Sequence, residues 1–215
     1  MTYGIPDYRL PLNIIEREIE NIKKTGVNII LNTKIGVDVS FRSLQKNYDA
    51  IFIAIGAQKT LQLGIPGEDL EGVYHGLDFL KRVILQRDLD FTGKKVAVIG
   101  GGNTAMDAAR VAKRMGAHAT ILYRRTKKFM PADEHELQLA IDEGVEFVEL
   151  AAPVKQSRGK LLCDKMILGE PDETGRRSPV KSGEQFTIPC DMVISAVGEQ
   201  VDAELMAANG IEMER

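Results

Sequence analysis

The hydrophobic residues of this 215-residue chain change their spacing several times along its length. Between residues 11 and 24 they recur every three or four positions among charged residues, which predicts an amphipathic helix that ends at Gly26. Two apolar runs follow at 27–31 and 48–55, and each has the length of one buried strand. The glycine- and proline-bearing residues 64–67 are typical of a linker.

From residue 76 onward, helical and strand-like segments alternate. The expected helices cover 76–87, 103–115 and 134–143, and the expected strands cover 96–99, 119–123, 145–150 and 191–197. Apolar runs at 161–168 and 185–190 flank a polar loop and indicate an antiparallel meander. The alternation predicts an α/β fold, namely a Rossmann-like, doubly wound parallel sheet with helices on its faces and the meander added to it.

The link between the strand at 96–99 and the following helix reads Gly-Gly-Gly-Asn-Thr-Ala. Gly100 permits a tight turn, Gly102 lets the backbone approach a pyrophosphate, and Ala105 is small enough for close packing of helix on strand. The free amides of the first helical turn would donate to the phosphates. A glycine-rich turn in another α/β protein would look similar, but the strand before it and the helix and strand after it favour dinucleotide binding.

Tyr123-Arg124-Arg125 ends the next strand, where such folds distinguish their two nicotinamide cofactors. An acidic residue there would accept from a ribose 2′-hydroxyl, whereas Arg124 and Arg125 suit a 2′-phosphate. The sequence therefore favours NADP(H) over NAD(H). The alternative is a solvated basic loop, since residues 124–128 contain four cations.

Composition narrows the class of protein without identifying it. With 44% hydrophobic and 27% charged residues and a formal net charge of −3, the chain resembles an ordinary globular protein with no nucleic-acid partner. Cys163 and Cys190 lack metal-ligand or redox-pair spacing, which favours reduced thiols, no metal site and a cytoplasmic location. We expect no membrane association, because no apolar stretch approaches about 20 residues and no signal peptide is visible.

Several stretches together resemble the pyridine-nucleotide:disulfide oxidoreductase superfamily, most closely the small (β) subunit of NADPH-dependent glutamate synthase and its relatives. Those relatives include flavoprotein subunits of bifurcating ferredoxin:NADP transhydrogenase and the flavin module of dihydropyrimidine dehydrogenase. The matching stretches are 3–11, 53–57, 63–73, 98–110, 122–126, 130–132, 143–147 and 191–198. They occur in the family's order over nearly the whole chain, which makes the resemblance more specific than any single motif.

The resemblance implies roles for particular residues. The pyrophosphate of NADPH would lie against Gly100, Gly102, Asn103, Thr104 and Ala105, and the 2′-phosphate against Arg124 and Arg125. Gly198 would lie near the nicotinamide, and Gly56 and Ala57 would touch FAD. No side chain need act as acid, base or nucleophile, because hydride transfer belongs to nicotinamide and flavin.

The resemblance also implies an organisation in domains. Residues 1–58 would be a partial FAD-binding segment, 59–198 the NADP(H)-binding domain, and 199–215 the start of a returning FAD-domain segment. The chain then corresponds to an excised middle part with Met1 as an added start, so we expect it to lack FAD and to be inactive alone. Apolar surface left on the FAD-domain remnants would favour self-association.

The expected function of the complete protein is passage of a hydride from NADPH to FAD, and of electrons to iron–sulfur centres or a partner subunit. The alternatives are a stand-alone NADP-binding module and an NADP-dependent dehydrogenase acting on a small substrate. A dehydrogenase requires a proton-transferring residue near the nicotinamide. Nothing in the sequence places His75, His118 or His135 there, and His118 is expected in the turn after a helix.

Overall fold

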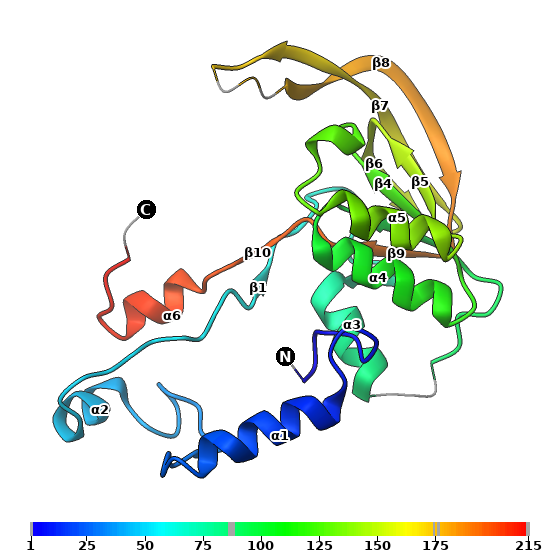
Figure 1. Cartoon of the computed structure of the whole chain (residues 1–215). Helices are drawn as coiled ribbons and strands as arrows, with labels where there is room; N and C mark the ends of the chain where they lie inside the picture. Colours follow the sequence, from blue (N-terminus) through cyan, green and yellow to red (C-terminus); the bar gives the residue numbers. More distant parts are fainter. Residues whose placement is uncertain (1, 86–88, 174, 176, 214–215) are drawn as a thin grey trace. The chain divides into compact units, whose positions relative to one another are not determined.

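The computed structural model describes residues 2–85, 89–173, 175 and 177–213 (Figure 1). Its contacts divide the chain into a larger unit, Met1–Pro11 with Gln62–Gly198, and a smaller unit, Leu12–Leu61 with Glu199–Arg215. The larger unit contains the glycine turn and both arginines. Residues 3–11, assigned above to the FAD segment, belong to this larger unit.

A five-stranded parallel sheet forms the centre of the larger unit. Its strands, in spatial order, are β2 (Val73–His75), β9 (Met192–Ser195), β3 (Lys95–Ile99), β4 (His118–Tyr123) and β5 (Glu146–Glu149). Four of these strands were predicted, and the three-residue β2 was not. His118 is the exposed first residue of β4, so its assignment to a turn was wrong.

Helices cover one face of this sheet (Figure 1). They are α3 (Gly76–Leu85), α4 (Asn103–Arg114) and α5 (Glu134–Asp142). The alanines of α4 are fully buried against Val98, Ile121 and Ile194, which lets the helix backbone approach the strands closely. The predicted helix at 76–87 is confirmed as far as Leu85, and its last two residues lie outside the described part of the chain.

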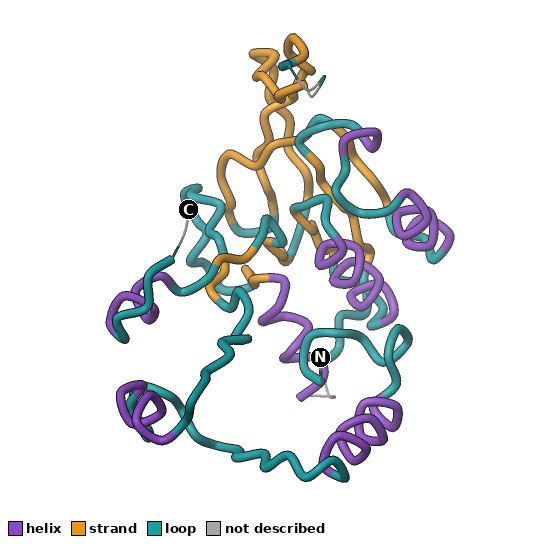
Figure 2. The backbone as a smooth tube through the Cα atoms, turned by 60° about the vertical axis from the view of Figure 1, so that its left-hand side comes forward, coloured by secondary structure: helices purple, strands orange, loops and turns teal. Residues whose placement is uncertain are grey.

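An antiparallel sheet packs on the opposite face. Its strands are β6 (Ala151–Ser157), β7 (Lys160–Pro171) and β8 (Arg177–Pro189), and Figure 2 shows their long hairpin. Leu161, Cys163 and Cys190 form a second core with Ile99 and Val193 of the parallel sheet. The α/β class and the meander are therefore confirmed, with one correction: the meander, rather than helices, covers this face.

The smaller unit contains little regular structure. It comprises α1 (Leu12–Lys23), α2 (Phe41–Asn47), α6 (Ala203–Ala208) and the two-residue strands β1 (Lys59–Thr60) and β10 (Glu199–Gln200), which pair antiparallel. The helix predicted at 11–24 is confirmed, but the strands predicted at 27–31 and 48–55 were wrong. A strand requires a hydrogen-bonded neighbour, and the described residues of this unit provide none for these runs. Phe52 is 93% exposed as a result, and self-association through such residues stays a prediction.

Glu143 at the end of α5 ties that helix to α4. Its carboxylate accepts from Arg110 at 3.0 and 2.7 Å and from Arg114 at the same two distances. The two guanidinium groups, Arg114 first, lower the pKa of Glu143 from its usual 4.5 to about 2. The charged carboxylate is thus favoured in the folded state.

We expect the free energy of unfolding to fall as the pH drops from about 4.5 towards 2, because a group with a depressed folded-state pKa loses its stabilising effect on protonation. Glu143→Gln should remove on the order of 1–2 kcal/mol at pH 6 and flatten this dependence, allowing for partial exposure. Urea unfolding at pH 6 and pH 3 measures both effects. The exposed Glu170→Gln on β7 is the matched control, and an equally steep dependence in Glu143→Gln would refute the assignment.

Candidate functional site

The glycine turn lies at the carboxyl edge of the parallel sheet, between the ends of β9 and β4. Gly100 has φ +149°, and a Cβ there would lie 2.2 Å from the carbonyl oxygen of Ala196. The amide of Gly100 donates to Leu122 O at 3.1 Å, and the amide of Ala196 donates to Ile99 O at 2.8 Å. Only glycine fits this position, because the backbone of Ala196, directly after strand β9, occupies the space of a side chain.

Gly101 joins the turn to the loop that carries the arginines. A Cβ on Gly101 would lie 2.5 Å from the ring of Tyr123, whose hydroxyl donates to Phe129 O at 2.7 Å. The amide of Ala132 donates to Gly101 O at 3.0 Å. Sequence reasoning gave Gly101 and Tyr123 no role, although a third consecutive glycine was itself a signal of a further close contact.

The beginning of α4 is open toward solvent. Gly102 occupies the N-cap position without a side-chain cap, and a Cβ there would meet no protein atom within 4 Å. Asn103 is exposed and Thr104 half-buried, whereas Ala105 is fully buried beside Gly100. The first-turn amides of an uncapped helix attract anions through their hydrogen atoms and the helix dipole.

Arg124 and Arg125 follow β4 at the same edge. Arg124 is exposed, while Arg125 is half-buried and its Nε is buried with no hydrogen-bond partner among the described residues. Leu150 donates to Arg125 O at 3.1 Å, which fixes the backbone of the loop. The structure thus places both predicted arginines one strand away from the predicted glycine turn, since β3 and β4 are neighbours.

The other predicted site residues are distributed differently. Gly198 follows β9 in the larger unit with φ +125°, while Gly56 (φ +66°) and Ala57 belong to the smaller unit. His118 starts β4 at the opposite edge, and His135 is exposed in α5. His75, however, is the last residue of β2 and therefore lies at the carboxyl edge.

The segment before α1 is held against α4 and α5 by charged groups. Arg9 forms ion pairs with Asp107 of α4 and Glu136 of α5, and the Tyr8 hydroxyl donates to Asp107 at 3.0 Å. Burial, first, and the Asp107 carboxylate raise the pKa of Tyr8. Asp107 is therefore the shared partner of Arg9 and Tyr8.

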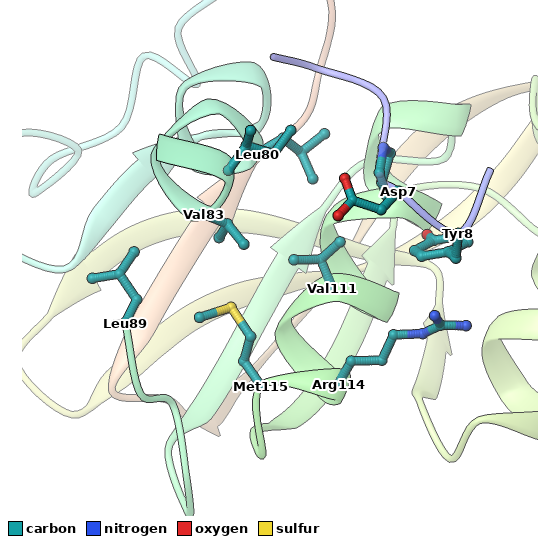
Figure 3. A pocket seen from close by; sticks show the side chains of 10 residues that line it. Asp7, Tyr8, Leu80, Val83, Leu89, Val111, Arg114 and Met115 are labelled. Atoms are coloured by element: carbon teal, nitrogen blue, oxygen red, sulfur yellow. The ribbon is translucent and has the colours of Figure 1, made fainter. Parts of the chain in front are cut away.

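A groove of about 370 Å³ lies beside this segment (Figure 3). Its walls include Tyr8, Leu80, Val83, Val111, Arg114 and Met115. Because Val111 and Arg114 lie in the last turn of α4 and Met115 is its C-cap, the groove is at the opposite end of the helix from the glycine turn. It is therefore separate from the candidate nucleotide site.

Neither cysteine is suited to redox chemistry. Cys163 and Cys190 are free and buried, and burial raises the pKa of their thiols to about 12 and about 11. The described residues contain no group of three side chains able to hold a metal ion. None of the described helices combines the length and hydropathy needed to cross a bilayer.

We expect Gly101→Ala to destabilise the protein by about 1–3 kcal/mol, because the added methyl group overlaps the Tyr123 ring. In a Tyr123→Ala background the same substitution should cost much less, since the obstacle is gone. Urea unfolding of the two single variants and the double variant measures this coupling. Additive losses would show that the Tyr123 ring is not what requires glycine at this position.

Comparison with known proteins identifies relatives of this chain. The chain is 44% identical over 215 residues to the NADP(+)-dependent formate dehydrogenase subunit beta of Moorella thermoacetica, matching 96% of this chain and 30% of that protein. It is 42% identical to the NADPH-Fe(3+) oxidoreductase subunit beta of Geobacter sulfurreducens, matching 98% of this chain and 33% of that protein. It is 36% identical to the glutamate synthase [NADPH] small chain of Escherichia coli, matching 100% of this chain and 49% of that protein. The chain thus spans about a third to a half of these relatives.

The fold is shared with solved structures. FprA from Mycobacterium tuberculosis in complex with NADPH has a TM-score of 0.76 at 21% identity, over 92% of this chain and 60% of that one. The sequence model for pyridine nucleotide-disulphide oxidoreductases matches residues 6–215. This chain belongs to the pyridine nucleotide-disulphide oxidoreductase family.

Proposed function

We propose that this chain is the NADP(H)-binding part of a flavoprotein oxidoreductase in which NADPH gives a hydride to FAD. Electrons would then pass to iron–sulfur centres or a partner subunit, as in a glutamate synthase small chain-like enzyme. The observation that carries the proposal is the glycine turn at the uncapped start of α4. It lies beside the two arginines that follow the neighbouring strand β4. The printed names of the relatives, which include NADPH-dependent oxidoreductases, support it.

The residues at the edge fit NADP(H). The pyrophosphate would lie against Gly100, Gly102 and the first turn of α4 from Asn103 to Ala105. A Cβ on Gly102 would meet no protein atom within 4 Å, so the glycine leaves this space open for the ligand. Arg124 and Arg125 would hold the 2′-phosphate. The buried Nε of Arg125 supports this role, because a guanidinium N–H without a partner is satisfied when an anion binds.

The residues described here do not by themselves form a flavin site. In the smaller unit, none of the described strands leads through a glycine turn into a helix, as a flavin pyrophosphate requires. We also propose, from the family alone, that Gly56 and Ala57 contact FAD and that Gly198 lies near the nicotinamide. The domain limits at 59–198 rest on the family as well. So does the cytoplasmic location.

Hydride transfer requires little acid–base chemistry from the protein. The nicotinamide supplies the hydride and the flavin accepts it, so the side chains bind and orient the dinucleotide. A binding module without hydride transfer is the second candidate, favoured by the lack of a flavin cradle among the described residues. Flavin absorbance of the purified protein would contradict a pure binding module, because it would show retained FAD.

Calorimetric titration with NADPH and, separately, NADH tests the proposal. We expect NADPH to bind at least about tenfold tighter, a difference of ~1.4 kcal/mol. The double substitution Arg124→Ala/Arg125→Ala should abolish this preference, because both cofactors then lack a guanidinium partner for the 2′-position. Lys128→Ala is the control, since it removes a cation from the same loop without touching either arginine.

Equal affinity of the unaltered protein for NADPH and NADH would refute the assignment of the arginines to the 2′-phosphate. A preference for NADPH that survives in the double variant would refute it as well. Loss of the preference in Lys128→Ala to the same degree would show that the overall charge of the loop, rather than the two guanidinium groups, is recognised.

A further inference from the structure

A buried carboxylate lies on the helix whose beginning forms part of the candidate nucleotide site. Asp107 is the fifth residue of α4, about 6 Å along the helix axis from Asn103. It is only 8% exposed. The helix dipole favours a carboxylate near this end, but the carboxylate competes with a bound phosphate for the same positive potential. A charged Asp107 therefore opposes the binding of a dinucleotide unless a cation neutralises it.

Asp107 belongs to a cluster of ion pairs that joins α4, α5 and segment 3–11. Among the described residues, the helices contribute two guanidinium groups and three carboxylates to this cluster, namely Arg110 and Arg114 with Asp107, Glu136 and Glu143. The third guanidinium group is that of Arg9, in segment 3–11. The charges in this cluster therefore balance only when segment 3–11 lies against the two helices.

Arg9 is placed to supply the missing charge. Its Nε donates to Asp107, and its two Nη atoms donate to the two carboxylate oxygens of Glu136, from Nη1 at 2.8 Å. The other side-chain hydrogen bond that Asp107 accepts in the described part of the chain comes from the uncharged Tyr8 hydroxyl. Without Arg9, Asp107 would be a buried carboxylate without an ion pair, which is the costly arrangement for a charge.

The backbone and the preceding side chain hold Arg9 in this position. The amide of Arg9 donates to Pro6 O at 2.9 Å, which closes a turn in the segment. The Tyr8 ring lies 4.0 Å from the guanidinium carbon of Arg114 and 4.5 Å from that of Arg110, and Figure 3 shows Tyr8 beside Arg114. Such stacking of cations on a ring favours the docked segment. Segment 3–11 is thus fixed to the helix that begins at the glycine turn.

We propose that Arg9 is a positioning residue of the NADP(H) site, because its guanidinium neutralises Asp107 while the phosphates of the dinucleotide bind at the start of α4. The inference rests on the proposed function. It makes segment 3–11 part of the site, although Arg9 and Asp107 are 98 positions apart in the sequence. The affinity for an anionic dinucleotide then depends on whether this segment is docked on α4 and α5.

Calorimetric titration with NADPH at low ionic strength tests the role of Arg9. Arg9→Gln should weaken binding about three- to tenfold, the effect of one uncompensated charge near the end of a helix. Arg9→Lys keeps the charge, so it should stay within about threefold of the unaltered protein. Arg17→Gln is the matched control, because it removes the same charge from an exposed ion pair on α1 and should leave the affinity within about twofold.

Two variants of Asp107 separate charge compensation from a purely structural contact. Asp107→Asn removes the charge but keeps an oxygen that accepts from Tyr8 and Arg9, so NADPH should bind up to about threefold more tightly. The double variant Arg9→Gln/Asp107→Asn should return to within about twofold of the unaltered protein, because both charges are gone. A structural contact predicts weaker binding in Asp107→Asn and no recovery in the double variant.

Salt and stability provide two further measurements. The affinity ratio between the unaltered protein and Arg9→Gln should approach one at about 0.5 M salt, because ions screen the uncompensated charge. Urea unfolding of the ligand-free variants shows which of them are folded under the titration conditions. If Arg9→Gln is unfolded, Asp107→Asn still gives the deciding sign, since it retains every guanidinium group of the cluster.

The outcomes are distinguishable. Unchanged NADPH affinity in Arg9→Gln, weaker binding in Asp107→Asn, or a double variant no better than Arg9→Gln overturns the inference and leaves Arg9 a structural contact. In each of these cases NADPH still binds the unaltered protein, so the proposed function stands. Failure of the unaltered protein to bind NADPH overturns the proposed function, and this inference with it.

Discussion

The close approach of backbone and ring atoms around Gly100 and Gly101 is the constraint on which the rest of the site depends. On one side the carbonyl of Ala196 occupies the place of a Gly100 side chain, and on the other the ring of Tyr123 occupies the place of a Gly101 side chain. Three strand exits, those of β9, β3 and β4, are therefore in direct contact through a turn that has no side chains. Any larger residue would separate them.

This contact aligns groups that are far apart in the sequence. Because the Ala196 amide bonds to Ile99 and the Gly100 amide bonds to Leu122, a shift of any one strand exit would break a backbone hydrogen bond. The bond from Ala132 to Gly101 extends the same fixation to the loop of Arg124 and Arg125. Side chains that bind successive parts of a long ligand need this shared reference, since a displacement of about 1 Å weakens such contacts severely.

Local patterns in the sequence were sufficient for the strands, the helices and the turn between 95 and 150, because each is specified by its own periodicity and its own glycine. These patterns failed where a strand forms only if a neighbouring strand pairs with it. The runs at 27–31 and 48–55 have strand composition but no described neighbour, whereas β2 has only three residues and still forms, because β9 pairs with it. The register of His75 with Ser195, 120 positions apart, depends on tertiary pairing and was not visible in the sequence.

The unpaired buried groups lie at the same edge of the parallel sheet as the uncapped start of α4. A folding defect would leave unpaired polar atoms scattered through the core, yet the three that occur among the described residues share one edge: Ser195 ends β9, His75 ends β2 and Arg125 follows β4. Each destabilises the free protein, and the fold tolerates them because a functional site commonly keeps such groups for its ligand. This edge is therefore the part of the described sheet where a bound ligand would add the most hydrogen bonds.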